Sequence, residues 1–309
     1  MNSAVQDHVL CGWRLRSEID LPELPPWRGD ERAPEIEFVL GEVPANFEAP
    51  VLKTPIAQVD AAGRIRFGIE GVCDYLVENG NRITMAPVLR PEAPDIRLFL
   101  LGAGLGLLCH QRGIVPLHAA AVEVDGKAVL LAGPSGVGKS TLAAAFLDRG
   151  HRVLSDDVAP LDWSGPEPLI LPSLQRIRLW RDSAERAGWS IDTLEPCRDD
   201  LQKFSKPLDT AHADAPLQPS ALIHVFRRDE RNSGIRFDRL RGVEAVQAMR
   251  QQIYRWRSLV GLIGRGDALR RVSQAAPLIP LHFSLRRPMR FRHLEETVDA
   301  VINAVREAV

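Results

Sequence analysis

A glycine-rich segment near the middle of the chain constrains its fold more than any other feature. Residues 133–141 have the sequence GPSGVGKST, which fits the pattern G-x-x-x-x-G-K-[ST]. An apolar run ends at Ala132, directly before the segment, and residues of high helix propensity follow it from Thr141 to Leu147. The sequence therefore predicts a strand, a tight loop and a helix in succession, as in α/β proteins.

The residue types of this segment suit a bound polyphosphate. Backbone N–H groups can surround a multiply charged anion only where side chains leave room, and glycines provide that room. Lys139 would place a positive charge on the outer phosphates, and the Ser140 hydroxyl could ligate a Mg2+ ion that bridges them. The dipole of the following helix faces the same anion. We therefore predict a phosphate-binding loop for ATP and Mg2+, formed by Gly133, Pro134, Ser135, Gly136, Val137, Gly138, Lys139, Ser140 and Thr141.

Two adjacent carboxylates follow the predicted helix. Residues 151–157 have the sequence HRVLSDD, which predicts a short strand that ends in Asp156 and Asp157. In a strand–helix–strand unit the second strand ends at the sheet edge that carries the phosphate loop, so both carboxylates should emerge beside bound phosphates. Adjacent strand residues point to opposite sides. We therefore expect one carboxylate to accept the proton of an attacking hydroxyl and the other to hold Mg2+.

A hairpin is predicted directly before the phosphate loop. Asp125 and Gly126 separate two alternating apolar runs, so one strand should end near Val124 and the next at Ala132. His118 lies at the start of the first strand. A histidine there is either a structural residue or a polar group that hydrogen-bonds a phosphate or an aspartate.

These three pieces together resemble the catalytic domain of the HPr kinase/phosphorylase family. The segments that carry the resemblance are LHAAAV at 117–122, the loop at 133–141 and RGHRVLSDD at 149–157, and their order and spacing agree with the family. Residues 11–24 are similar to the opening of shorter HPr-kinase-like proteins. Some of those proteins accompany lasso-peptide biosynthesis and phosphorylate a serine at the C-terminus of the precursor peptide.

The resemblance implies a serine kinase in which Asp156 is the general base, Ser140 and Asp157 hold Mg2+, and His118 lies near the phosphates. It also implies assembly into a homo-oligomer. The chain departs from the family in two respects. It lacks the glycine-rich Glu-Arg-Gly-type segment that is linked to the reverse, phosphorolytic reaction, and Thr141 stands where many members have an acidic residue. The missing segment weakens the case for a reverse reaction and for HPr as the substrate.

The first third of the chain differs in character from the rest. Short segments with strand character, among them 36–40 and 64–69, are separated by many prolines, and a proline cluster at 87–94 marks a boundary. An apolar helix is predicted for 96–109. We therefore expect a small β-rich N-terminal module over residues 1–94 and a P-loop HPr-kinase-like domain over residues 95–309, α/β in class within a chain that is α+β overall.

Basic residues in the C-terminal half are further candidates for contacts with substrate or phosphate. The alternation over 174–180 predicts a strand that carries Arg176 and Arg178 on one face, where an arginine could stabilise charge on the transferred phosphoryl group. A solvated sheet face is the alternative. Lys203 and Lys206, in a predicted polar loop, allow the same two interpretations.

The remaining elements point to packing rather than chemistry. A buried strand is predicted over 221–226, with His224 as a core residue, and amphipathic helices are predicted over 244–259 and 294–309. Tyr254–Arg257 mixes aromatic and basic residues, but within a helix of a neutral chain it does not indicate RNA binding.

Composition excludes several classes of partner. The 39 lysines and arginines against 40 aspartates and glutamates give a net charge of −1, whereas a nucleic-acid surface usually needs a basic excess. The apolar stretch over 96–109 is too short to span a bilayer, and the first residues lack the parts of a secretory signal. The four cysteines form no CxxC pair, as expected in a reducing compartment. We expect a cytoplasmic protein without a nucleic-acid or membrane partner.

The sequence thus favours an ATP- and Mg2+-dependent kinase that phosphorylates a serine hydroxyl of a peptide or small protein, including the C-terminal serine of a lasso-peptide precursor. A non-catalytic nucleotide-binding regulatory module and a bifunctional HPr(Ser) kinase/phosphorylase remain as alternatives. A nucleotide hydrolase that activates water is a further one, but no guanine-selecting Asn-Lys-x-Asp stretch is present.

Overall fold

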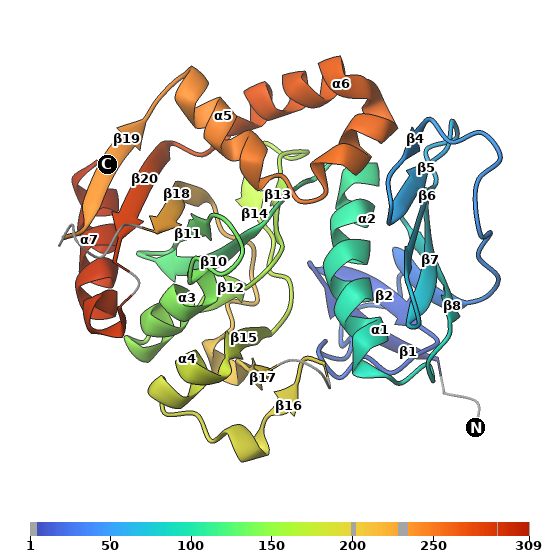
Figure 1. Cartoon of the computed structure of the whole chain (residues 1–309), viewed down its shortest axis with the longest axis horizontal. Helices are drawn as coiled ribbons and strands as arrows, with labels where there is room; N and C mark the ends of the chain where they lie inside the picture. Colours follow the sequence, from blue (N-terminus) through green and yellow to red (C-terminus); the bar gives the residue numbers. More distant parts are fainter. Residues whose placement is uncertain (1–4, 199–201, 228–233, 289, 309) are drawn as a thin grey trace. The chain divides into compact units, whose positions relative to one another are not determined.

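The computed structural model describes residues 5–198, 202–227, 234–288 and 290–308, and the chain divides into two compact units (Figure 1). The first unit comprises Met1–Pro116 and Tyr254–Arg271, and the second comprises Leu117–Ile253 and Val272–Val309. The chain crosses between them in strand β9 (Val115–Leu117), between Ile253 and Tyr254, and within helix α6 (Trp256–Ala275). Both units combine helices with sheets, so the predicted α/β class is confirmed.

The first unit is built on an eight-stranded sheet. Buried and less buried residues alternate along β1, β2 and β3, as expected where one face of a sheet is covered. In the order in which they pair, the strands are β1 (Gln6–Leu10), β2 (Trp13–Ser17), β3 (Ile36–Leu40), β8 (Arg82–Pro87), β7 (Cys73–Glu78), β6 (Ile65–Ile69), β5 (Ala57–Val59) and β4 (Leu52–Lys53).

The helix predicted over 96–109 is present and packs against this sheet. It consists of α1 (Pro94–Phe99), a π-helical turn η1 (Leu100–Gly104) and α2 (Leu105–Gln111), and its apolar residues are almost all buried. The Tyr75 hydroxyl of β7 donates a 2.9 Å hydrogen bond to the carbonyl oxygen of Ile96. The first unit therefore extends to Pro116 and not only to the expected boundary at residue 94, because these helices pack against its sheet.

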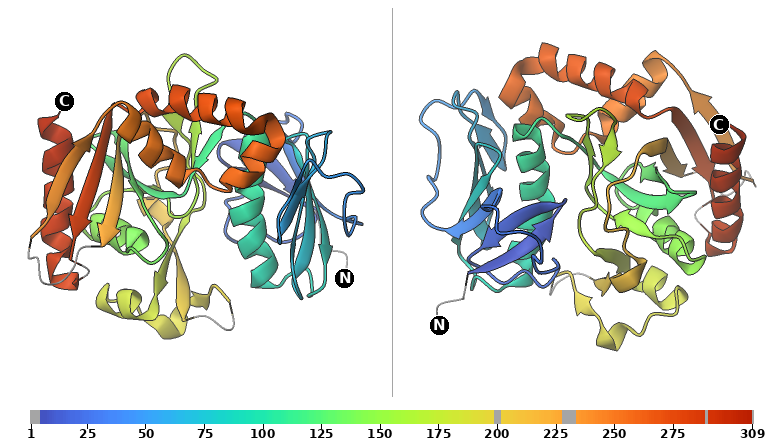
Figure 2. Two further views of the ribbon diagram at one scale, coloured as in Figure 1. Left: turned by 45° about the horizontal axis from the view of Figure 1, so that its top comes forward. Right: turned by 180° about the vertical axis from the view of Figure 1, so that it is seen from behind.

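The second unit is built on a six-stranded mixed sheet (Figure 2). Strands β11, β18 and β20 run parallel, whereas β10, β12 and β19 pair antiparallel with their neighbours. In pairing order the strands are β12 (Val153–Ser155), β10 (Ala119–Val124), β11 (Lys127–Ala132), β18 (Pro219–Arg227), β20 (Leu281–Arg287) and β19 (Arg236–Leu240).

Helices α3 (Lys139–Asp148) and α7 (Leu294–Glu307) pack side by side within the apolar core on one face of this sheet (Figures 1 and 2). Val298, Val301 and Val305 of α7 are buried in this core, so the amphipathic helix predicted over 294–309 is confirmed over the described residues. Asp125 and Gly126 both have positive φ, 50° and 76°, as a two-residue hairpin turn requires. The predicted hairpin is therefore also confirmed.

Smaller elements complete the second unit. A three-stranded sheet contains β15 (Arg176–Trp180), β17 (Lys203–Pro207) and β16 (Glu195–Pro196), and β13 (Ala159–Asp162) pairs with β14 (Leu169–Ile170). The other helices are α4 (Arg181–Arg186), α5 (Val243–Gln252) and the 3-10 turns η2 (Ile191–Thr193), η3 (Asp209–Ala211), η4 (Ala276–Leu278) and η5 (Phe291–His293). No helix among the described residues is long and apolar enough to cross a membrane.

Two predictions about these elements are wrong. Lys203 and Lys206 lie on strand β17, which pairs antiparallel with β15, and not in a polar loop. The single helix predicted over 244–259 is broken between α5 and α6, where Arg255 has a φ of 52°. At the break Ile253 bridges to Leu117, so a backbone contact with a distant strand ends the helix.

Candidate active site

The phosphate loop connects the end of β11 to the start of α3, as the sequence predicts. Three of its glycines, Gly133, Gly136 and Gly138, have positive φ values of 146°, 78° and 86°. A Cβ on Gly133 would lie 2.4 Å from the backbone oxygen of Val225 on β18. The loop therefore crosses the neighbouring strand so closely that only glycine fits at its first position.

Lys139 is the first residue of α3 and its ammonium group is held inside the loop. It is 7% exposed, and its Nζ donates hydrogen bonds to the carbonyl oxygens of Gly133 at 2.9 Å and Pro134 at 3.3 Å. Burial lowers the pKa of Lys139, whereas Asp157 and Asp156 raise it. The hydrogen-bond partners of the ammonium among the described residues are thus neutral groups, two carbonyl oxygens and a histidine, and a phosphate would add a direct anionic partner.

His118 links Lys139 to Asp157. Its Nε2 lies 3.1 Å from the Lys139 Nζ, and its Nδ1 lies 3.2 Å from the Oδ1 of Asp157. An ammonium group has only hydrogens to donate, so Nε2 accepts here and Nδ1, which carries the ring hydrogen, donates to the backbone carbonyl oxygen of Asp157 at 3.2 Å, beside the carboxylate. His118 is therefore a polar member of the site and not a residue of the core.

The two aspartates contact different groups. β12 runs parallel to β11 although β10 lies between them, and this direction brings both carboxylates to the loop. The Oδ2 of Asp156 accepts the backbone N–H of Arg178 at 2.8 Å, and the nearby Ser140 hydroxyl lowers the pKa of this carboxyl group. The Oδ1 of Asp156 has no hydrogen-bond partner among the described residues. Asp157 instead pairs with His118.

Their proton affinities also differ. Burial raises the pKa of Asp156, against the effects of Ser140, Lys203 and the Arg178 amide. Burial acts in the same direction on Asp157, but the interaction with His118, together with the charges of Arg178 and Lys203, lowers its pKa to about 2. Asp156 is therefore the stronger base, and Asp157 remains an anion.

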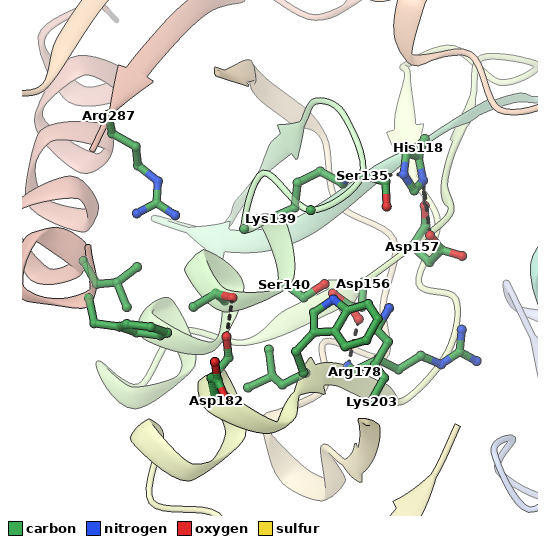
Figure 3. A pocket seen from close by; sticks show the side chains of 18 of the residues that line it. His118, Ser135, Lys139, Ser140, Asp156, Asp157, Arg178, Asp182, Lys203 and Arg287 are labelled. Carbon is green, nitrogen blue, oxygen red and sulfur yellow. Dashed lines mark hydrogen bonds and ion pairs between the residues drawn. The ribbon is translucent and has the colours of Figure 1, made fainter. Parts of the chain in front are cut away.

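The loop and the aspartates line one pocket of about 310 Å³ in the second unit (Figure 3). Of the proposed basic contacts, Arg178 and Lys203 line it, whereas Arg176 does not and instead pairs with Glu195 at 3.2 Å. Gly133, Pro134 and Val137 lie outside the lining, and Val137 packs in the core. Several further residues, which no sequence motif indicates, also line the pocket: Leu179, Trp180, Asp182, Ser183, Arg287, Arg290, Phe291 and Leu294.

Comparison with known proteins relates part of this pocket to a family. Residues 113–173 match the family model of the HPr Serine kinase C-terminal domain. This segment is HPr-kinase-like. The resemblance inferred from the sequence is thereby confirmed, and the HPr-kinase-like segment contains His118, the phosphate loop and both aspartates. Arg178, Lys203 and Arg287 lie outside it.

Individual relatives match over part of their length. The HPr kinase/phosphorylase of Nitrosomonas europaea is 46% identical over 52 residues, which are 17% of this chain and 16% of that protein. The HPr kinase/phosphorylase of Listeria welshimeri is 37% identical over 98 residues, 30% of this chain and 31% of that protein. The chain thus matches less than a third of either relative. The Hpr(Ser) kinase/phosphatase structure from Coxiella burnetii aligns with 62% of this chain and 90% of that chain, at a TM-score of 0.30 and 17% identity.

Proposed function

We propose that the chain is an ATP-dependent kinase that phosphorylates a serine hydroxyl of a peptide or small protein. The observation that carries this proposal is Asp156, which lines the same pocket as the phosphate loop and whose buried Oδ1 has no hydrogen-bond partner among the described residues. A carboxylate oxygen with a free lone pair and a raised pKa is suited to accept a proton from a hydroxyl beside the γ-phosphate.

The proposed reaction is an in-line transfer. The loop amides and Lys139 hold the phosphates of ATP, and the hydroxyl oxygen of the acceptor attacks the γ-phosphorus. The hydroxyl proton passes to Oδ1 of Asp156, and the bond to the bridging oxygen breaks to release ADP. His118 would position Lys139 and Asp157 relative to each other through its two ring nitrogens.

The donor set also fits Mg2+. Ser140 supplies a hydroxyl oxygen and Asp157 a permanently ionised carboxylate, and the charge of Asp157 raises the pKa of Asp156. A divalent cation would relieve this repulsion and neutralise charge on the phosphates. Mg2+ is usually held by one or two protein oxygens together with the phosphates of the substrate.

The acceptor end of the pocket favours a peptide with a C-terminal serine. Arg178 and Lys203 bring two cations to the wall beside Asp156, and the half-exposed Trp180 lies next to them. A C-terminal serine carries its own carboxylate a few bonds from the hydroxyl, and two cations would bind it. This chemistry supports a precursor-tailoring kinase, for which lasso-peptide precursors are the candidate acceptors.

Phosphate transfer from labelled ATP to serine peptides tests the proposal. We expect transfer to a peptide that ends in a free-acid serine, weaker transfer to its C-terminal amide, and none by Lys139→Ala. ATP binding without any product would favour a regulatory module instead, and phosphate release without acceptor would favour a hydrolase. Loss of the phosphoryl group from the product on addition of inorganic phosphate would establish the bifunctional alternative.

We also propose a cellular location and an oligomeric state for the enzyme. All four cysteines are buried and none of them forms a disulfide, which supports a cytoplasmic location. Self-assembly into a homo-oligomer is proposed from the family resemblance, and size-exclusion chromatography coupled to light scattering would measure it.

A further inference from the structure

The guanidinium of Arg287 is a buried charge that the proposed reaction does not use. Arg287 ends β20, is 2% exposed and lines the pocket of the phosphate loop. Within the described part of the chain it has no hydrogen-bond or ion-pair partner, and its Nε is a buried donor. Burial alone lowers its pKa to about 10. An unpaired buried cation is unfavourable in a fold, so an anion in the pocket is its natural partner.

The sheet order places Arg287 and the aspartates on opposite sides of the phosphate loop. β11, which leads into the loop, lies between β12, which precedes Asp156, and β20, which ends at Arg287. Figure 3 shows Arg287 on one side of Lys139 and the two aspartates on the other. A triphosphate that crosses the loop with its γ-phosphate at Asp156 therefore directs its other end toward Arg287.

An apolar wall adjoins Arg287 in the same pocket. Phe291 and Leu294 line it and are partly buried, and the Arg186 guanidinium covers the Phe291 ring at 4.4 Å. On the same side, the Thr141 hydroxyl hydrogen-bonds the Ser183 hydroxyl at 3.1 Å, which ties α3 to α4. A cation can bind the phosphate of a nucleotide, and an aromatic ring beside it can stack on the base.

We propose that Arg287 binds the phosphates nearest the nucleoside and that Phe291 and Leu294 contact the base. This assignment rests on the proposed nucleotide-binding function and extends it to the end of the pocket opposite the reacting phosphate. It makes Arg287 and Phe291 the residues that distinguish a nucleotide donor from a bare polyphosphate or pyrophosphate.

Calorimetric titration of the full chain with Mg-ATP and with Mg-tripolyphosphate tests this assignment. Arg287→Met should weaken both ligands roughly 10- to 100-fold, because each places a phosphate at the guanidinium. Phe291→Ala should weaken ATP roughly tenfold and leave tripolyphosphate unchanged, because only ATP has a base. Arg286→Met is the matched control: it removes the same charge from the exposed neighbour on β20 and should leave both affinities within about twofold.

A thermal melt without ligand separates ligand binding from a structural role. If Arg287 has no charged partner until an anion binds, Arg287→Met removes an unpaired buried charge. The melting temperature of this variant should then equal or exceed that of the wild type. A variant that melts well below the wild type and recovers with Arg287→Lys would show that the fold itself needs the charge, and this would overturn the proposal.

The binding data also separate this inference from the proposed function. Unchanged ATP affinity in Arg287→Met, in a wild type that binds ATP, refutes the role of Arg287 alone. Equal losses of ATP and tripolyphosphate in Phe291→Ala refute the base contact. A wild type that binds neither ligand refutes the nucleotide function together with this inference, whereas binding without phosphate transfer refutes only the kinase reaction.

Discussion

Replacement of Gly133 by alanine tests how closely the phosphate loop crosses β18. The new Cβ would lie 2.4 Å from the carbonyl oxygen of Val225, and this oxygen belongs to the backbone of a central strand. The strand is hydrogen-bonded on both sides, to β11 and to β20, so it cannot be displaced unless these neighbouring strands move as well. The φ of 146° at Gly133 is also one that alanine rarely adopts.

Gly136→Ala provides a matched control from the same loop. Gly136 has a φ of 78°, but no atom lies within 4 Å of its ideal Cβ. Its substitution should therefore cost only the left-handed backbone, about 1–2 kcal/mol. Gly133→Ala adds the forced displacement of packed backbone, about 1–3 kcal/mol, to a backbone strain of similar size. We expect it to lower the free energy of unfolding by roughly 2–5 kcal/mol.

Urea denaturation followed by circular dichroism measures this difference. The midpoint of Gly133→Ala should lie clearly below that of Gly136→Ala. The ATP affinity of Gly133→Ala should fall at least about tenfold, because the loop amides move with the first glycine. Equal midpoints for the two variants, with ATP binding retained in both, would refute the close crossing as the reason for this glycine.

Further outcomes follow from single residues. Burial, with a smaller effect of His282, lowers the pKa of His224 to about 3. As the pH falls, the unfolded chain therefore binds the proton first, and the free energy of unfolding should decrease from pH 6.5 toward 3, by roughly 2 kcal/mol at pH 5. In urea denaturation at pH 7 and 5, His224→Phe should lose less stability than the wild type between the two pH values. An equal loss in both proteins would contradict this. His118→Asn breaks the link from Lys139 to Asp157 and should lower kcat for transfer about tenfold, with the ATP Kd little changed; an unaltered kcat would show that the link is dispensable. Trp180→Ala should raise the peptide KM about fivefold and leave the KM for ATP unchanged in steady-state kinetics, and an unchanged peptide KM would place the acceptor elsewhere.

The parts of the site that the sequence predicts are contiguous. The hairpin turn at Asp125, the loop glycines and the strand that ends at Asp156 each have a local signal, because a turn, a positive φ or a strand–helix–strand connection dictates particular residue types at fixed spacing. These signals locate one side of the pocket within a single segment, and the structure brings its members together.

The opposite side of the pocket has no such local signal. Arg287 and Phe291 reach it because β20 pairs with β18, and strand order in a parallel sheet is not encoded in any short motif. The loop predicted around Lys203 is wrong because β17 is short and is defined by its pairing with β15. The prediction of one helix over 244–259 is wrong for a related reason. The backbone bridge from Ile253 to Leu117 interrupts the helix although the apolar periodicity continues.

The rate of phosphate transfer by Asp156→Asn tests the central claim most directly. Asparagine keeps an oxygen that can accept the Arg178 N–H, which now donates at 2.8 Å, but it cannot take up the acceptor's proton. With the ATP affinity within about threefold of the wild type, the account predicts a kcat lowered by about 10²–10⁴. Undiminished transfer to a serine peptide by this variant would contradict the account.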